Sequence, residues 1–418
     1  MTSFRSLAHN HDFTVLWIGQ TISELGSRMS MFVFPLLAYQ LTGSALSAAA
    51  AESSHLLGLA LTLLPAGVLA DRVDRRRLMR FASASGALLY ASLVTAALLG
   101  ELTIPHLFGV ALLTGVTAGI FAPSEISAIR AVVRSEELPT ALSQNQARQH
   151  VASLVGGPIG GALYGVTRWL PFAADAVSFA ISWVLLGRIR TDLSAPVNPN
   201  RKRPREELLA GLAFIRSRPF FRVLIVWAAS TNLLVNAVFF VAVLRLIEAG
   251  FDPVHIGLVE TAAGIAGIAG ALAAPWIIDR LPTGRLTAAA AWSFVPLLIP
   301  MALWNHPLIV ALALGGGVFL NPAGNAGMGA YRIAVTPDEL QGRVQSTMQF
   351  ITMSTLPLSP LVAGVLLAHL GGAPAVIVLA VLCAGAALIP TLSPSIRAVP
   401  RPAQWVTEKP EPVAVAAA

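Results

Sequence analysis

Charged residues are scarce in this chain. Only 12% of its 418 residues are Asp, Glu, Lys or Arg, whereas 55% are hydrophobic, and the mean hydropathy is +0.71. An apolar fraction this large does not fit inside the core of a water-soluble protein. The composition therefore indicates a chain whose main solvent is lipid.

Other absences narrow the function. The single cysteine, Cys383, excludes an intrachain disulfide and argues against a cysteine metal site. The sequence has no GxxxxGK[ST] phosphate loop, no HExxH motif and no loop long enough for a soluble catalytic domain. Acids and histidines scatter instead of gathering at one membrane face. We therefore expect no enzyme, no metal and no direct use of ATP, and a multi-pass membrane enzyme remains only a remote alternative.

Apolar segments of roughly 18 to 28 residues recur along the chain, and each can cross about 30 Å of hydrocarbon as a helix. The first follows a polar start and carries Glu24 and Arg28, so it matches a cleaved signal peptide poorly. The predicted spans are 14–41, 46–70, 78–99, 106–129, 143–166, 172–188, 221–244, 256–278, 286–303, 308–331, 345–368 and 374–392.

The positive charge follows the predicted topology. When the spans are threaded with both termini on one side, all but three of the 28 Lys and Arg residues lie on that side. The exceptions are Arg168 and Arg245 on the other side and Arg28 within a span. The positive-inside rule makes the basic side the cytoplasm. A net charge of +7 could suggest a nucleic-acid partner, but its placement on one side of the spans predicts instead a bacterial inner or plasma membrane protein with cytoplasmic termini and no nucleic-acid partner.

The chain divides into two similar parts. We expect a six-helix half over 1–190, a cytoplasmic linker over 191–220 with a short surface helix at 205–217, a second six-helix half over 221–393 and a disordered tail over 394–418. Residues 70–72 match 278–280 at the same offset at which Glu24 and Arg28 match Asn232 and Asn236. This pattern is typical of a duplicated all-α transporter with its substrate site between the halves.

Several motifs carry a family resemblance. The stretch "GVLADRVDRRRLM" at 67–79 resembles the signature loop of the major facilitator superfamily, and "LVGGPIGGALYG" at 154–165 is similar to its antiporter motif. Segments 10–29, 135–147 and 336–346 resemble the drug:proton antiporter branch that includes macrolide efflux and enterobactin export proteins. Asp74 departs from the signature, which usually has glycine there, and this leaves the local turn open.

The resemblance implies a secondary transporter that exports a small amphipathic compound, such as a drug, antibiotic or secondary metabolite, in exchange for protons. It implies no cofactor beyond the proton gradient and a lipid bilayer as surroundings. A monomer is expected, since such a fold needs no partner to bury its cavity. A siderophore exporter and a proton-coupled importer of the same fold are the alternatives, and a non-transporting receptor is a remote one.

The signature loop has two interpretations. Its arginines either anchor the loop to anionic lipid headgroups, or, as the resemblance implies, Asp71 and its neighbours latch the cytoplasmic ends of the halves together. Glu125 and Arg130 lie close together near the same membrane face, either as a second gate pair or as simple interfacial charges. The expected gate residues are Gly67, Asp71, Arg72, Arg75, Glu125, Arg130, Asp279, Arg280 and Arg332.

Glu24 and Arg28 are four residues apart on one helical face, about 15 Å into the predicted span, and can pair there. Charges at that depth face an interior cavity because lipid exposure costs at least about 2.5 kcal/mol each. They form either a structural ion pair or a proton-coupling site. Glu52, with His55 on the same face, is a second candidate for protonation, whereas Asp175 and Glu260 are expected to be solvated near the outer surface.

Polar and aromatic residues predict the substrate cavity. Amide pairs in two C-terminal spans lie at the depth of Glu24, with aromatic rings nearby, a mixture that suits a bulky amphipathic ligand. Hydrogen bonding between helices is the alternative role of the amides. The expected lining residues are Asn232, Asn236, Asn321, Asn325, Trp17, Phe121, Phe239 and Phe319.

Small residues surround a proline in the span 143–166. Glycines at four-residue spacing allow helices to approach closely, and proline bends the backbone, so we expect a kinked, tightly packed helix. The residues of this helix-packing motif are Gly156, Gly157, Pro158, Gly160, Gly161 and Gly165.

Overall fold

The computed structural model describes residues 7, 9–194 and 204–405, without the side chains of 63, 64, 67, 68, 70, 71 and 204–208. Within these residues every regular element is a helix. The N-terminal half contains α2 (His11–Thr42), α3 (Ala45–Arg72), α4 (Arg75–Leu99), α5 (Ile104–Val132), α6 (Leu138–Val166) and α7 (Leu170–Leu186). The linker carries α8 (Pro204–Ser217).

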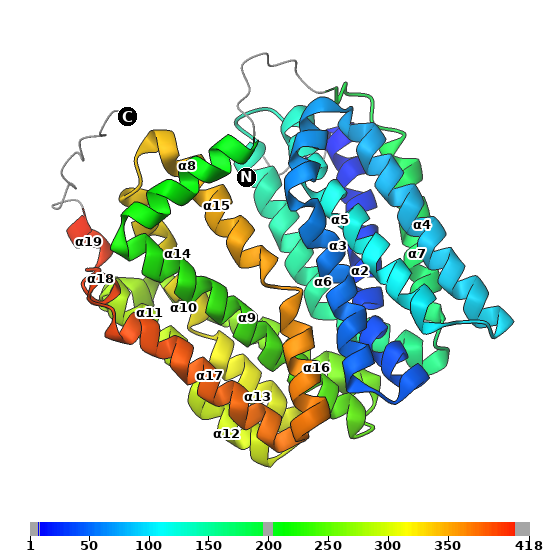
Figure 1. Cartoon of the computed structure of the whole chain (residues 1–418). Coiled ribbons are helices and arrows are strands. Elements are labelled where there is room, and N and C mark those ends of the chain that lie inside the picture. The colour runs from blue at the N-terminus through cyan, green and yellow to red at the C-terminus, as the bar shows by residue number, and fades with distance from the viewer. Residues whose placement is uncertain (1–6, 8, 195–203, 406–418) are drawn as a thin grey trace.

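The C-terminal half is also helical, and it forms the second bundle in Figure 1. Its helices are α9 (Pro219–Glu248), α10 (Pro253–Arg280), α11 (Thr283–Trp292), α12 (Val295–Leu303), α13 (Pro307–Val318), α14 (Asn321–Ala334), η1 (Asp338–Leu340), α15 (Gln341–Ser354), α16 (Leu358–Leu370) and α17 (Gly372–Leu392), followed by α18 (Pro394–Arg397) and α19 (Pro402–Trp405). The predicted all-α class is confirmed, and every predicted span falls on helix.

Among the described residues, eight helical segments are long and apolar enough to cross a membrane: 75–99, 104–132, 219–248, 253–280, 283–303, 307–334, 338–370 and 372–392. Helix α7 is apolar but shorter. Helices α2, α3 and α6 have 32, 28 and 29 residues, lengths that suffice for a span. Glu24 and Arg28 lower the hydropathy of α2, and all three helices line the space between the halves.

The ends of the helices define two faces of the molecule. The start of the described chain and α8 lie toward the top of Figure 1, and α19 lies at its left edge; we call the face that they share the terminal face. The short turns at 43–44, 100–103, 167–169, 249–252 and 304–306 lie at the other, which we call the distal face. Gly43 and Gly100 end α2 and α4 there with φ of 66° and 76°, a conformation that glycine adopts at little cost.

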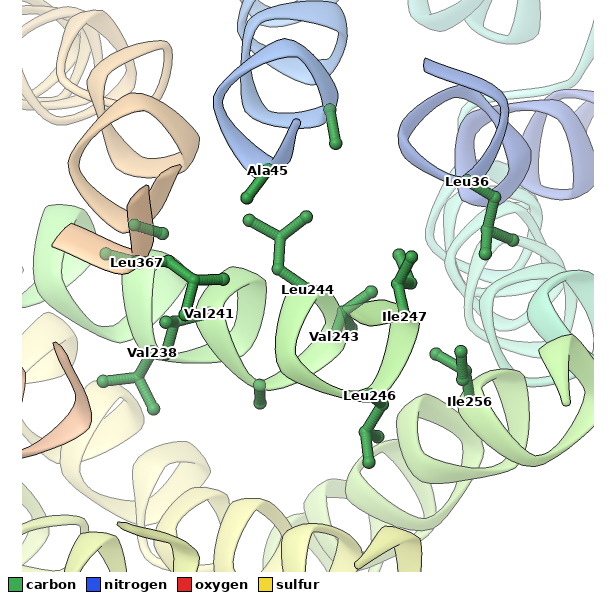
Figure 2. Packing of buried hydrophobic residues seen from close by; sticks show 14 of the residues in the cluster. Leu36, Ala45, Val238, Val241, Val243, Leu244, Leu246, Ile247, Ile256 and Leu367 are labelled. Atoms are coloured by element: carbon green, nitrogen blue, oxygen red, sulfur yellow. The ribbon is translucent and has the colours of Figure 1, made fainter. Parts of the chain in front are cut away.

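The two halves pack together toward the distal face. One buried hydrophobic cluster joins Leu36 and Ala45 of the N-terminal half to Leu244, Ile247 and other residues of the C-terminal half. Figure 2 shows Leu244 and Ile247 projecting from α9 toward the N-terminal helices that carry Ala45 and Leu36. A Cβ on Gly364 of α16 would lie only 2.5 Å from Ala49 Cβ in α3, so these helices are in close contact.

Toward the terminal face each half has a core of its own. Leu7, Met79 and Leu186 belong to a cluster drawn from the N-terminal half alone, whereas Ile215 and Phe221 belong to one drawn from the linker helix and the C-terminal half. The halves also diverge in this direction in Figure 1. The structure is therefore closed at the distal face and parted at the terminal face.

Three spans of the C-terminal half are interrupted. The predicted helices 286–303, 308–331 and 345–368 break at 293–294, 319–320 and 355–357. Prolines 296, 322 and 357 lie at or directly after these breaks, where a missing N–H and a fixed φ disfavour a continuous helix. In the N-terminal half, by contrast, α2, α3, α5 and α6 each contain a proline and continue through it.

The boundaries of the tail differ from expectation. Residues 394–405, predicted as part of a disordered tail, form α18 and α19, and Ile396 is fully buried. The amide of Gly284 donates to Val399 O at 3.1 Å, which ties the tail to the start of α11. A few scattered apolar side chains, of which Ile396 and Val399 are buried, were too weak a signal to find this. The rest of the tail, 406–418, lies outside the described residues.

Candidate functional site

A cavity of about 500 Å³ lies between the two halves. Helices α2, α3 and α6 line it from one half, and α9, α10, α13 and α16 line it from the other. Its volume is within the range of small-molecule sites. Its lining residues include Arg28, Met31, Phe32, Glu52, His150, Gly157, Asn236, Phe239, Phe240 and Glu260.

Charged side chains from both halves meet in this cavity. Arg28 Nε donates to Glu24 Oε1 at 2.9 Å, and the side chains of Arg28 and Glu24 are 39% and 24% exposed. The pairing expected from the i, i+4 spacing is therefore present, and it faces open space. Glu52 of α3 and Glu260 of α10 line the same cavity. The expectation that Glu260 is solvated at the outer surface is wrong.

The glycines of α6 allow this convergence. A Cβ at Gly156 would overlap Arg28 Cβ, and a Cβ at Gly157 would lie 3.2 Å from Glu260 Oε2. Gly157 also approaches the backbone of Gly257 in α10, and Gly160 approaches Met29 in α2. Helix α6 thus contacts α2 on one side and α10 on the other because it carries no side chains at these positions. Gly165 has no atom within 4 Å of such a Cβ.

The predicted asparagines line an adjoining chamber of about 300 Å³ within the C-terminal half. Asn232, Asn321 and Asn325 line this chamber, and Asn236 lines both it and the central cavity. Asn232 Nδ2 donates to Thr352 O at 2.9 Å, and Asn236 Nδ2 donates to Asn232 O at 2.7 Å. Asn232 and Asn236 therefore bond within the protein as well as facing the cavities.

The broken helices border these spaces. Phe294, Asn321 and Met353, beside the three breaks, line the C-terminal chamber. Discontinuous helices near the midplane are a common way to build transporter sites, because helix ends present free backbone groups. These spans were predicted as continuous helices, so the breaks differ from expectation.

The four aromatic residues predicted to line one cavity lie in different parts of the structure. Phe239 lines the central cavity, whereas Trp17 lines a third, largely apolar cavity of about 680 Å³ between α2 and α6. Phe121 packs against the N-terminal core, and the backbone of Phe319 approaches Gly270. Phe121 and Phe319 line none of these three cavities in the described part of the chain.

The signature loop is held by its own half. Asp74 is the N-cap of α4, with φ −53°, and its Oδ1 accepts from the amides of Arg76 and Arg77 at 2.8 and 3.1 Å. A capping carboxylate thus explains the aspartate at a position where glycine is usual, and no left-handed turn is needed. Arg75 is buried and donates to Ser194 O at 2.6 Å.

The other expected gate residues do not join the halves in this arrangement. Arg72, Arg130, Asp279 and Arg280 are exposed, and Arg280 lies 3.9 Å from the ring centroid of Trp276 in its own helix. Arg332 donates to Gln345 within the C-terminal half. Only the helical backbone is described for Gly67 and Asp71, and the predicted role of these two residues lies outside the described part of the structure. This agrees with the parted terminal face.

Glu125 has a different partner from the one that its position in the sequence suggested. Arg148 Nη2 of α6 donates to Glu125 Oε1 at 2.7 Å and to Asn145 Oδ1 at 2.6 Å, and the two charged side chains are only 2% and 9% exposed. Arg130 is exposed instead. Arg148 lies within the predicted span 143–166, and that isolated basic residue was the signal that could have found it.

Two further carboxylates, Asp175 and Asp12, are buried and hydrogen-bonded within the N-terminal half. Asp175 is fully buried, accepts from Ser178 Oγ at 2.9 Å and lies against Gly26, so the expectation that it is solvated is wrong. Asp12 accepts from Arg190 N, Thr191 N and Thr191 Oγ1 at 3.0, 2.7 and 2.6 Å.

His55 is buried, and its Nδ1 lies 3.3 Å from Thr114 Oγ1. It does not line the cavity that Glu52 lines.

The arrangement suits binding and coupled movement. Apolar and aromatic surfaces surround a few charged and amide groups, which is the composition of a site for an amphipathic small molecule. The lining comes from both halves, so a change in their relative tilt alters the cavity. In the described part of the chain, no group of three or more His, Cys, Asp or Glu residues could hold a metal ion.

Comparison with known proteins gives a consistent result. Residues 16–325 match the model of the Major Facilitator Superfamily. The chain is 26% identical over 366 residues to the multidrug efflux pump Tap of Mycolicibacterium fortuitum, an alignment that covers 81% of this chain and 85% of that protein.

Solved structures share the fold at low identity. The nucleoside transporter NupG has a TM-score of 0.71 at 11% identity, covering 91% of this chain and 97% of its own. A bacterial homologue of the human lysosomal transporter Spinster, inward-facing and unoccupied, has a TM-score of 0.69 at 13% identity, covering 94% and 98%. An inward-facing bacterial homologue of ferroportin has 0.66 at 17%, also covering 94% and 98%.

The family match spans well over half of the chain, and the structural likeness extends over both helical halves. These findings agree with the internal repeat and with the cavity between the halves. This protein is a multi-pass membrane protein that belongs to the major facilitator superfamily of transporters.

Proposed function

We propose that this chain exports a small amphipathic compound in exchange for protons, by alternating access of the cavity between its halves. The observation that carries the proposal is the meeting of Arg28, Glu52 and Glu260 in a cavity also lined by Phe32, Phe239 and Phe240. The aromatic surfaces suit an apolar ligand, and the carboxylates supply groups that can take up protons. Similarity to a multidrug efflux pump supports the direction and the substrate class.

Coupling rests on the pair of Glu24 and Arg28. At this depth the arginine stabilises the ionised carboxylate, whereas desolvation destabilises it. A small change in either effect therefore favours gain or loss of a proton. In the proposed cycle, protonation of Glu24 releases Arg28 and favours one orientation of the halves, whereas substrate binding favours proton loss. No cofactor takes part, and a monomer contains the whole cavity.

The basic terminal face is proposed to be cytoplasmic, in a bacterial inner or plasma membrane. Arg75 and Arg76 already bond to the loop after α7, so they hold the signature loop to its own half. Asp71 remains the proposed latch residue that closes the terminal face when the distal face opens.

The latch predicts different effects at two positions of one loop. Asp71→Asn removes the charge that would join the halves, so we expect transport to be lost at near-normal membrane abundance. Arg77→Gln is the matched control, because Arg77 is exposed and other arginines still anchor the loop. Efflux of ethidium from loaded cells measures both variants. Equal, small effects would leave the loop with an anchoring role alone.

Export itself is tested in an efflux-deficient bacterial host. We expect expression of the chain to lower accumulation of ethidium or erythromycin and to raise resistance to it, and a proton uncoupler to abolish the difference. Accumulation that rises on expression would favour import by the same fold. No change with a broad panel of amphipathic drugs would contradict drug export and turn attention to siderophores.

A further inference from the structure

Glu260 lines the central cavity but has no assigned step in the proposed cycle of Glu24 and Arg28. It lies in α10 of the C-terminal half and is half-buried, and its Oε2 faces the backbone of Gly157 across the boundary between the halves. It lines the same cavity as Arg28 of the N-terminal half. This carboxylate and this guanidinium therefore face one space from opposite halves.

Helix α6 makes that approach possible. Gly156 receives Arg28 of α2, and the adjacent Gly157 receives Glu260 of α10. Side chains at these two positions would separate the helices that carry the charges. The glycine pair thus acts as a thin spacer between opposite charges, and not merely as a close packing contact.

The charges of the cavity are unbalanced. Its titratable or charged lining groups are Arg28 from α2, Glu52 from α3, His150 from α6 and Glu260 from α10, whereas α9, α13 and α16 contribute uncharged side chains. Glu24 is already bonded to Arg28. Three carboxylates near one guanidinium leave excess negative charge in a poorly solvated space, which proton binding relieves.

We propose that Glu260 is a second coupling residue, contributed by the C-terminal half, which holds the distal face closed through Arg28 when ionised and releases it when protonated. This inference rests on the proposed proton antiport and extends it. An empty, ionised transporter then stays closed at the distal face, which prevents a futile cycle. Protonation removes the attraction across the boundary and lets the halves separate there.

The test measures distal opening without transport. Cysteines replace Val166 and Ala249, exposed residues at the distal ends of α6 and α9, in a Cys383→Ser background. Spin labels at the two sites report their separation in lipid nanodiscs without substrate. If opening binds one proton, lowering the pH from about 8 to about 5 favours the open form. The ratio of open to closed molecules should then rise by up to about tenfold for each unit by which the pH falls.

Three variants separate the outcomes. Glu260→Gln should raise the open fraction at all pH values and abolish its pH response, because the uncharged amide no longer attracts Arg28. Glu101→Gln, an exposed distal acid, should behave as the parent. Gly157→Ala places a Cβ 3.2 Å from Glu260 Oε2 and should raise the open fraction and flatten its pH response, which provides a second test if Glu260→Gln folds poorly.

A parent protein whose label separation ignores pH would overturn the inference, and so would a Glu260→Gln variant that keeps the parent response. Neither result bears on export, because no substrate or gradient is present. Conversely, the parent protein could fail to export drugs in cells although its distal opening responds to pH through Glu260. That result would overturn the proposed function and leave the assignment of Glu260 standing.

Discussion

Asp12 shows how one carboxylate joins two helices at the terminal end of the N-terminal half. It precedes the span 14–41 and accepts hydrogen bonds from Arg190 and Thr191 after α7. Burial acts to raise the pKa of Asp12, but hydrogen bonds from Thr191, His11 and the backbone amides of Arg190 and Thr191 outweigh it. The pKa therefore lies well below its usual range, and the ionised form stabilises the fold.

The pH dependence follows from that sign. A lowered pKa in the folded state contributes stability above the unfolded value of about 3.9, and the contribution is lost as the pH falls through the folded pKa. Asp12→Asn should therefore lower the melting temperature at neutral pH, by an amount corresponding to about 1–3 kcal/mol. The difference from the parent should shrink below about pH 4. A difference that is equally large in acid would contradict the charge-based explanation.

Glu125 and Arg148 mark the limit of reasoning from sequence at this scale. Spacing along one helix predicted the pair of Glu24 and Arg28 because i, i+4 neighbours share a face. Glu125 and Arg148 lie on different helices. A basic residue within a predicted span indicates that Arg148 has a buried partner, but which acid it meets depends on how α5 and α6 pack. Asp175 is similar, since its burial depends on Gly26 of α2 leaving room for it.

Among the elements, α6 shows most clearly how small residues position a site. Its glycines were recognisable as a packing motif in the sequence, but their neighbours were not. Gly156 and Gly160 face α2, whereas Gly157 and Gly161 face α10. The motif therefore joins the two halves at the distal side as well as packing the first half.

Two glycines of α6 provide a matched pair of substitutions. Gly156→Ala should lower the melting temperature and reduce transport, because the new Cβ would overlap Arg28 Cβ. Gly165→Ala adds the same methyl group where nothing lies within 4 Å. It should be neutral or stabilising by up to about 1 kcal/mol, since alanine favours helix. Thermal unfolding in detergent measures both, and equal effects would argue against close packing at Gly156.

The breaks in the C-terminal helices could not be predicted from the sequence for a physical reason. Apolar length predicts that a segment crosses the bilayer, but not whether proline interrupts it or is absorbed. Pro158 lies within a continuous α6, whereas Pro357 lies directly before α16. Whether a helix breaks at a proline depends on whether neighbouring helices supply hydrogen-bond partners for the backbone groups that the proline leaves unpaired.

At the scale of the whole molecule, the repeat and the charge distribution predicted the architecture from the sequence. Twelve apolar segments, an internal duplication and one basic side suffice to predict two six-helix halves with a cavity between them. Which face is closed could not be predicted, because the proposed alternating access requires the same chain to populate both arrangements. The structure has the distal face closed, and this places Glu260 beside Gly157.

Topology is tested with single cysteines in the Cys383→Ser background. Glu101→Cys lies in the distal turn after α4 and is exposed, so a membrane-impermeant maleimide should label it in intact cells. Tags inserted at residue 200 or fused to the C-terminus should be inaccessible until the cells are opened. Protection of position 101 in intact cells, or labelling of the tags, would overturn the assignment of the terminal face to the cytoplasm.

The central claim is that a proton gradient drives export through the pair of Glu24 and Arg28. Glu24→Gln mimics the protonated acid permanently, so it should bind and exchange substrate but not move it uphill. A purely structural pair predicts instead a lower folding yield, because Arg28 loses its partner, and partial rescue by Arg28→Met in the double mutant.

The most direct measurement uses purified protein in liposomes with an acidic interior and ethidium outside. The parent should accumulate ethidium above its external concentration and stop when the pH gradient is collapsed, whereas Glu24→Gln should only equilibrate it. Accumulation by Glu24→Gln at close to the parent rate under the same gradient would contradict the account, and so would parent accumulation that survives collapse of the gradient.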